Sequence, residues 1–247
     1  MKDARLSMGM PIEIEIVGAQ ANSALNGAYE YFTSVDNRFS TYKPQSEISR
    51  INRGELAVID ASPEMREILA LAQKTKKETD GYFNILRPDG HLDPSGIVKG
   101  WAIHGVAERI RAQGFQNFFV NAGGDIASSG TNELGESWSV GIRSPFRVDE
   151  IVKVLYPRGK GVATSGSYMR GAHIYNPHNP DKAMQDIVSI TVIGPDVLEA
   201  DRYATAAFAM GKKGAAFIEF LPGFEAYAID KGGQATFTSG FAAYTEP

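Results

Sequence analysis

Two hydrophobic periods occur in this chain, and their order along the sequence limits the folds that it can adopt. The segment Ile12–Ile16 alternates apolar and acidic residues with period two, which predicts a half-buried strand. Residues 96–113 carry apolar side chains every four positions from Val98 to Ile110, which predicts a helix that Gly114 ends. Patterns of the two kinds are interspersed without regular alternation. The expected class is therefore α+β, with mixed or antiparallel sheets packed against helices.

Other helices and strands are expected where cap or turn residues bound an apolar stripe. Ser62-Pro63-Glu64 begins a helix, because it supplies a hydroxyl cap, a proline at the first helical position and an acid near the positive end of the dipole. Asp80-Gly81 ends that helix. Further helices are expected near 22–35, 201–210 and 213–220, and further strands at 118–120, 138–142, 152–156, 187–193, 226–229 and 235–238. The sequence has no repeat or obvious linker, so residues 1–247 are expected to form one domain.

Composition excludes several classes of function. The net charge of -4 argues against nucleic acid as the main partner, because phosphate backbones attract basic surfaces. The absence of cysteine excludes disulfides, thiolate catalysis and Cys-based zinc sites. No stretch approaches the ~18 consecutive apolar residues of a membrane span, and residues 1–6 do not resemble a signal peptide. We therefore expect a soluble, cytoplasmic protein unless a leader has been removed from it.

Asp201 and Thr205 form the first candidate site. In a helix they lie four residues apart on one face, where a carboxylate and a hydroxyl offer two hard oxygen ligands for Mg²⁺. The alternative is an ordinary helix, in which the dipole stabilises Asp201 and Thr205 bonds to a carbonyl of its own helix.

Asp93 to Gly100 forms the second candidate site, at the predicted start of a helix. Lys99 lies one turn into that helix and is placed to reach a phosphate, and the Gly96 carbonyl is unobstructed by a side chain. The alternative is an Asp-capped helix with a solvated lysine. A third segment, Val120 to Ile126, ends a strand in Gly-Gly-Asp; it either brings backbone close to a ligand or makes a tight turn.

His173 differs from the other three histidines because it lies in a polar turn before Asn176-Pro177. An exposed imidazole there is a candidate general base, although a lone histidine is more often structural. The four histidines lack metal-ligand spacing, which argues against a zinc site. Ser165 lacks the GxSxG setting of a serine hydrolase.

Taken in order, these segments resemble the ApbE family of FAD:protein FMN transferases through nearly the whole chain. Ala163 to Gly166 matches the family's ATSG, and Val120 to Ile126 matches VNAGGDI. In the first half of the chain, Met8-Gly9 resembles the family's Met-Gly-Thr start, residues 39–52 resemble STY…SEISRIN, and residues 79–84 resemble TDGAFD. Further along, residues 93–100 resemble DLGGIAKG, residues 173–177 resemble HIIDP, and residues 200–211 resemble ADALSTALFVMG.

The resemblance implies an ApbE-like fold and transfer of FMN from FAD to a Ser or Thr hydroxyl of a target flavoprotein, with release of AMP. It implies that Mg²⁺ is held by Gly96, Asp201 and Thr205 and that His173 is the base. It also implies FAD contacts from Met8, Tyr42, Tyr82, Phe83, Asn84, Asp93, Lys99 and Ile174. Two alternatives stay open: hydrolysis of FAD to FMN and AMP, and FAD binding without turnover.

The chain departs from the family pattern between Asn84 and Asp93. The family usually has a much longer segment there, with a Trp-Gly-Phe-Gly stretch near the flavin, whereas this chain has only Ile85 to Leu92. Asn84 and Asn176 stand where the family usually has Asp. These departures leave the predicted metal and phosphate residues intact and concern the flavin end of the site.

Overall fold

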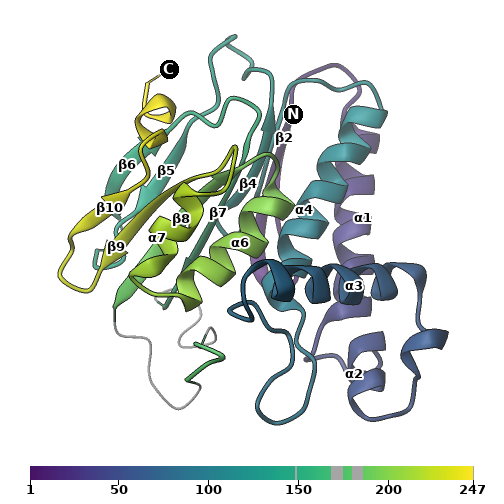
Figure 1. The fold of residues 1–247 in the computed structure, drawn as a ribbon. Helices are drawn as coiled ribbons and strands as arrows, with labels where there is room; N and C mark the ends of the chain where they lie inside the picture. Colours follow the sequence, from purple (N-terminus) through teal and green to yellow (C-terminus); the bar gives the residue numbers. More distant parts are fainter. Residues whose placement is uncertain (148, 168–174, 180–185, 247) are drawn as a thin grey trace.

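An antiparallel sheet of eight strands is the centre of the fold (Figure 1). The computed structural model describes residues 1–147, 149–167, 175–179 and 186–246. In spatial order the strands are β1 (Lys2–Ser7), β2 (Met10–Ile16), β3 (Phe118–Ala122), β4 (Asp125–Ser129), β7 (Gly161–Gly166), β8 (Ile187–Gly194), β9 (Glu225–Asp230) and β10 (Ala235–Phe237). A separate antiparallel pair consists of β5 (Val140–Arg143) and β6 (Ile151–Leu155).

Helices cover one face of the large sheet, as Figure 1 shows. They are α1 (Asn22–Phe39), α2 (Glu47–Asn52), α3 (Pro63–Glu78), α4 (Ser95–Ala112), α6 (Val197–Ala209) and α7 (Lys213–Glu219), with the short 3-10 turn η1 (Val58–Asp60). A second 3-10 turn, η2 (Phe241–Tyr244), lies on the other face. The helices are grouped on one side rather than inserted between parallel strands. The predicted α+β class is therefore confirmed.

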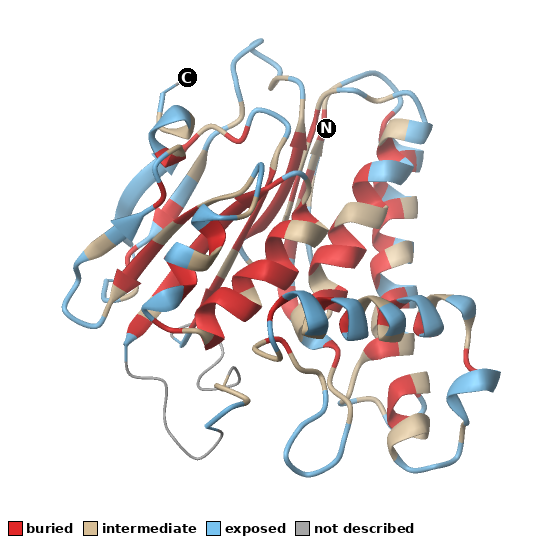
Figure 2. Cartoon of the chain, viewed as in Figure 1, coloured by how far each residue is buried: buried red, intermediate tan, exposed pale blue. Residues whose placement is uncertain are grey.

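Three apolar clusters hold these layers together. One joins α1 and α4 to β2 and β3, and a second joins α6 and α7 to β8 and β9. The third lies on the opposite face of the sheet, where β5, β6 and η2 cover β4, β7 and β8. In Figure 2, α6 is buried on nearly all sides, whereas α3 is exposed along its outer face. The helix that carries Asp201 is thus an interior element.

Several local signals in the sequence produce the structure expected of them. Ile12, Ile14 and Ile16 are fully buried on one face of β2. The hydroxyl of Ser62 accepts a hydrogen bond from the amide of Met65 at 3.2 Å, which caps α3. Gly114 ends α4 with a φ of +91°, in the left-handed region that favours glycine.

Four elements were not predicted from the sequence, although two of them, β1 and β4, pair with the strand next to them in the chain. The four are β1, α2, β4 and β7. Half of β7 is Gly and Ala, which are depleted in strands. It forms because it pairs with β8 from Gly161 to Gly166.

Candidate active site

α4 and α6 meet at Gly100, where their backbones approach closely. The Gly100 amide donates a hydrogen bond to Oδ2 of Asp201 at 2.7 Å. A Cβ at position 100 would lie 2.6 Å from Cβ of Asp201 and 2.8 Å from the carbonyl of Val197. A glycine is therefore required for these helices to come together and orient the Asp201 carboxylate.

Asp201 belongs to a buried cluster with Lys99 and Asp125. Nζ of Lys99 lies 2.6 Å from Oδ2 of Asp125 and 3.8 Å from Oδ1 of Asp201. Asp201 is 2% exposed and Asp125 is fully buried. Two carboxylates thus share one ammonium, which leaves an excess negative charge when both are ionised.

This charge imbalance has a consequence for protonation. Burial raises the pKa of Asp201 from an ordinary 3.8 to about 7; Lys99 and the Gly100 amide oppose the rise, and the neighbouring Asp125 adds to it. The ammonium of Lys99 is the charged partner of Oδ2 of Asp125. A cation bound here would balance the excess charge.

Thr205 and Gly96 face each other across the same contact between helices. The Thr205 hydroxyl donates to the Gly96 carbonyl at 3.3 Å. Asp196 caps α6 by accepting from the Glu199 amide at 2.9 Å, so Asp201 lies in the second turn rather than at the helix terminus. The ordinary-helix alternative is wrong on both points, because Thr205 bonds to α4 and Asp201 is not a terminal residue.

The oxygens gathered here suit a small hard cation. The Asp201 carboxylate, the Thr205 hydroxyl and the Gly96 carbonyl are the donor types that Mg²⁺ prefers. Among the described residues there is no group of three or more His, Cys, Asp or Glu side chains arranged for a metal. The donor set therefore fits Mg²⁺ and not a transition metal that needs several imidazoles or thiolates.

Asp125 is a site residue that the sequence reading did not single out. It begins β4 directly after a two-residue turn in which Gly123 and Gly124 have φ of +60° and +97°. Such a turn joins β3 to β4 in a tight hairpin, so the Gly-Gly pair makes the turn that was one of its two predicted alternatives. The amide of Thr164 on β7 donates to Oδ1 of Asp125 at 3.0 Å. The signal in the sequence that could have identified Asp125 is an acid directly after a glycine turn between two apolar strands.

The turn after α3 carries three of the predicted FAD contacts. The amide of Phe83 donates to the hydroxyl of Thr79 at 3.0 Å, and Phe83 is 1% exposed. A Cβ on Gly96 would lie 3.4 Å from the Phe83 ring, so this ring lies beside the candidate metal site. Tyr82 and Asn84 are half-buried. The structure thus brings Phe83 to the cluster as a core residue.

A short hairpin replaces the longer segment of the family pattern. Leu86 pairs with Leu92 by an isolated bridge, and the side chain of Asn52 makes two hydrogen bonds to the Leu92 backbone, at 2.9 and 2.8 Å. Asp93 follows, and its Oδ1 accepts from the Ser95 amide at 3.1 Å at the start of α4. Asn52 therefore fixes the entry into the helix that carries Gly96 and Lys99.

Other predicted residues lie apart from the cluster or outside the described residues. Met8 sits in the β1–β2 turn with a φ of +52°, and Tyr42 is 94% exposed. The described contacts do not join either of them to Asp201. His173 and Ile174 lie outside the described residues.

The segment that follows His173 is attached to the turn after α3. Nε2 of His178 lies 2.8 Å from the carbonyl of Asp80, and its ring meets Tyr82 edge-on at 4.5 Å between centroids. The Tyr175 hydroxyl donates to the Leu86 carbonyl at 3.1 Å. The sequence reading found no special setting for His178, because its partners lie far away in the chain.

Comparison with known proteins decides the family. The profile of the ApbE family matches residues 8–88 and 86–228, which make up most of the chain. The chain belongs to the ApbE family. The resemblance predicted from its motifs is confirmed.

Relatives and solved structures agree with this membership of the ApbE family. The chain is 25% identical to the FAD:protein FMN transferase of Salmonella typhimurium, over 98% of this chain and 86% of that protein. It is 30% identical to that of Klebsiella pneumoniae, over 65% of this chain and 47% of the relative. Its fold matches the flavin transferase ApbE from Vibrio cholerae with a TM-score of 0.86 at 22% identity, covering 99% and 98% of the two chains. It matches the ApbE protein from Thermotoga maritima with a TM-score of 0.88 at 20% identity, covering 100% and 99%. Both structural matches establish the fold.

The two matched parts of the ApbE profile meet at residues 86–88, within the short hairpin. The break therefore coincides with the place where the motif comparison found the family's longer segment missing. The described helices include none that is long and apolar enough to cross a membrane.

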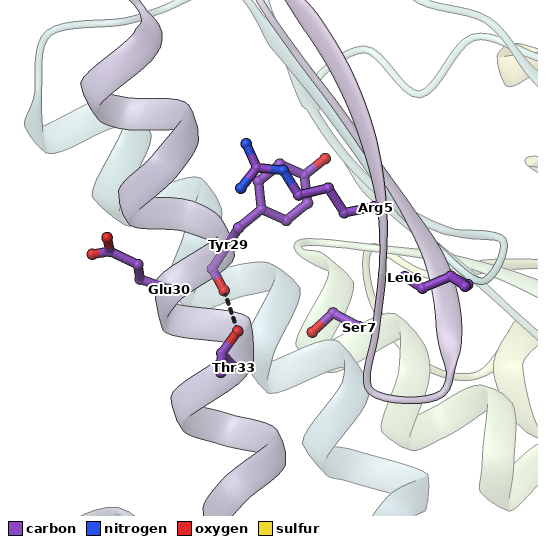
Figure 3. A pocket seen from close by; sticks show the side chains of 6 residues that line it. All are labelled: Arg5, Leu6, Ser7, Tyr29, Glu30 and Thr33. Carbon is purple, nitrogen blue, oxygen red and sulfur yellow. Dashed lines mark hydrogen bonds between the residues drawn. The ribbon is translucent and has the colours of Figure 1, made fainter.

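A hollow of about 300 Å³ between β1 and α1 lies apart from these ApbE motifs (Figure 3). Its lining residues are Arg5, Leu6, Ser7, Tyr29, Glu30 and Thr33. The Arg5 guanidinium lies over the Tyr29 ring at 4.2 Å, and the Thr33 hydroxyl bonds to its own helix at Tyr29. These groups are engaged with each other, and none belongs to the Asp201 cluster.

Proposed function

We propose that this chain transfers the FMN half of FAD to a Ser or Thr hydroxyl of an acceptor flavoprotein, with Mg²⁺ as cofactor and AMP as the second product. The observation that carries the proposal is the buried cluster of Lys99, Asp125 and Asp201 beside the Gly96 carbonyl and the Thr205 hydroxyl. The names of the relatives, FAD:protein FMN transferase, support the same reaction.

Mg²⁺ would be held by the Asp201 carboxylate, the Thr205 hydroxyl and the Gly96 carbonyl. When bound, it supplies neutralisation of negative charge on the pyrophosphate of FAD. The Gly100 amide keeps Asp201 oriented, which limits the reorganisation that binding requires.

Lys99 and the start of α4 would bind the pyrophosphate. Lys99 lies in the second turn of α4, beside the carboxylates of Asp125 and Asp201. The positive end of the helix dipole favours anions as well. Asp93, Tyr82, Phe83 and Asn84 surround this end of α4 and are proposed to contact FAD, together with Met8, Tyr42 and Ile174.

The bonds made and broken define what the protein must do. The acceptor hydroxyl oxygen forms a bond to the phosphorus of the FMN half, and the bond from that phosphorus to the bridging oxygen breaks. AMP leaves with the bridging oxygen, and the hydroxyl proton passes to a base. His173 is the proposed base, since its ordinary pKa suits proton transfer near neutral pH.

Mass spectrometry tests the proposal. The chain is incubated with FAD, MgCl₂ and a flavoprotein fragment that carries an Asp-x-x-Ser/Thr-Gly-Ala/Ser-Thr acceptor motif. A mass gain of one FMN on the Ser or Thr, with AMP released in equal amount, is the expected result. FMN and AMP without acceptor modification would assign hydrolysis instead. FAD binding with neither product would leave a binding protein and overturn the proposal.

A matched set of variants makes the mass assay specific. An acceptor with Ala in place of the modified Ser or Thr must gain no mass. Asp201→Asn must lose the Mg²⁺-dependent product, whereas Asp196→Asn, which keeps a capping side chain on the same helix, must retain it.

A further inference from the structure

Arg202 follows Asp201 directly and points the other way, toward α3. Its guanidinium is almost fully buried, with the residue 2% exposed. Within α6 it donates from Nε and Nη2 to the two carboxylate oxygens of Glu199, at 2.9 and 2.5 Å. Across to α3, Nη1 donates to Oε2 of Glu78 at 2.5 Å and to the Thr75 hydroxyl at 3.0 Å. One buried cation therefore joins α6 to the last turn of α3.

The contact sets two carboxylates against one guanidinium, and Nζ of Lys74 lies 3.7 Å from the other carboxylate oxygen of Glu78. Burial alone would raise the pKa of Glu78, but hydrogen bonding and charge from Arg202 outweigh it and place that pKa below its ordinary value. The Tyr203 hydroxyl donates to the same Glu78 oxygen at 3.1 Å. Glu78 is thus ionised and held from two neighbouring residues of α6.

Hydrogen bonds connect the last turn of α3 to the candidate flavin residues. The Thr79 hydroxyl donates to the Thr75 carbonyl at 2.8 Å and accepts from the Phe83 amide at 3.0 Å. A series of hydrogen bonds therefore runs from Arg202 through Thr75 and Thr79 to Phe83. Phe83 lies in turn beside Gly96, whose carbonyl accepts from Thr205 on α6.

We propose that Arg202 is a positioning residue for FAD, which fixes the turn at residues 79–84 relative to the face of α6 that carries Asp201 and Thr205. The proposal rests on the proposed function, because it assigns the two parts that Arg202 joins to the flavin end and the metal end of one substrate site.

General energetics favour positioning over simple stabilisation. A buried ion pair gains little net stability over a well-packed apolar pair, because both charges lose their hydration. A guanidinium that donates two parallel hydrogen bonds to one carboxylate has a fixed orientation. Arg202 is held by Glu199 in this way, so its remaining donors present a fixed geometry to Glu78 and Thr75.

The test compares FAD affinity with Mg²⁺ binding in the full chain. Arg202→Gln, Arg202→Lys, Glu78→Gln and the Arg202→Gln/Glu78→Gln double variant are made. Arg38→Gln is the control, because Arg38 also joins helices through two carboxylates, but at the start of α3. The Kd for FAD is measured by flavin fluorescence in EDTA, where no turnover occurs. The rise in Tm caused by MgCl₂ is measured separately.

Loss of the contact is expected to weaken FAD binding by about three- to ten-fold in Arg202→Gln and in Glu78→Gln. The double variant should bind FAD no more weakly than the weaker-binding single variant, because the two single changes remove the same interaction. The FAD affinity of Arg202→Lys should lie between those of wild type and Arg202→Gln, because an ammonium keeps the charge but cannot make two parallel hydrogen bonds to one carboxylate. The MgCl₂-induced rise in Tm and the Arg38→Gln affinity should match wild type.

Other outcomes separate the possible failures. A lower Tm with unchanged FAD affinity in folded Arg202→Gln or Glu78→Gln overturns the positioning role. If Arg202→Gln does not fold, Glu78→Gln decides alone, since Arg202 then keeps Glu199 as its partner. Failure of wild type to bind FAD rejects the proposed function, and the positioning role with it.

Discussion

The backbone amide of Gly100 on α4 donates to the carboxylate of Asp201 on α6, 101 residues later in the chain. This bond fixes the carboxylate before any metal arrives. The geometry of the site therefore depends on how closely two helices pack.

Gly100→Ala should destabilise the protein by about 2 kcal/mol, because the added methyl overlaps Asp201 and the Val197 carbonyl. Denaturant unfolding measures the change in free energy, and the MgCl₂-induced rise in Tm should shrink with it. Gly27→Ala in α1 is the control, since a methyl there meets nothing within 4 Å. That substitution should be neutral or stabilise by up to about 1 kcal/mol. Equal effects of the two changes would contradict the close approach.

Asp201→Asn should lower Mg²⁺-dependent turnover by about 100-fold or more. The amide keeps the shape of the side chain but loses the charge that attracts a divalent cation. Because Lys99 keeps its ion pair with Asp125, the fold should be retained. Turnover at saturating MgCl₂ and the circular dichroism spectrum measure both effects. Unchanged turnover would remove the metal assignment.

Stability should depend on pH through Asp201. Its pKa in the folded chain is about 7, above the ordinary 3.8, so the folded protein holds a proton that the unfolded chain has released. The stabilisation from this group is therefore complete below about pH 4 and is lost as the pH rises through about 7. Since Mg²⁺ binds the ionised carboxylate, the MgCl₂-induced rise in Tm should grow from about pH 6 to about pH 8. A rise of equal size at both pH values, or one that persists in Asp201→Asn, would contradict this.

Lys99→Met should destabilise the metal-free protein by about 3 kcal/mol, because it leaves Asp125 and Asp201 buried without their shared cation. MgCl₂ should restore part of the loss, since a bound cation replaces part of the missing charge. Urea unfolding with and without MgCl₂ measures both quantities. Lys74→Met is the control, because the Lys74 side chain is 64% exposed and its effect should be within about 0.5 kcal/mol. Loss of stability that MgCl₂ does not reduce would argue against a cation beside these carboxylates.

His173→Ala should lower the rate of FMN transfer by about 100-fold while changing the Kd for FAD by less than about threefold. The reason is that a base acts in the transition state and contributes little to ground-state binding. The control is His91→Ala, in which an exposed imidazole is removed. Losses of similar size in rate and affinity would make His173 a binding residue instead.

Short-range signals predicted much of the fold. The Ser62 cap, the glycine at the end of α4 and the alternating isoleucines of β2 all concern residues within a few positions of each other. Physical rules for caps, turns and periodicity act over that range. Such signals place individual elements and do not reveal which distant strands pair.

In the candidate site, too, short-range signals were predictable from the sequence and long-range contacts were not. The spacing of Asp201 and Thr205 predicted a shared helix face, but it gave no sign that the hydroxyl of Thr205 bonds to Gly96, 109 residues away. Asp125 and Arg202 were missed because their partners, Lys99 and Glu78, lie on other elements. The motif resemblance indicated the region, and the tertiary contacts identified these two residues.

The length of the Gly123-Gly124 turn decides which side chain of β4 faces Lys99. Successive strand residues point to opposite faces, and Ile126 packs on the far side of the sheet from Asp125. Deleting one residue from this turn, with a matching shift of the β4 register, would place Ile126 where the acid now stands. A family member with a shorter turn here should lack an acid at this position, so turn length offers a marker for altered sites that residue identity alone would miss.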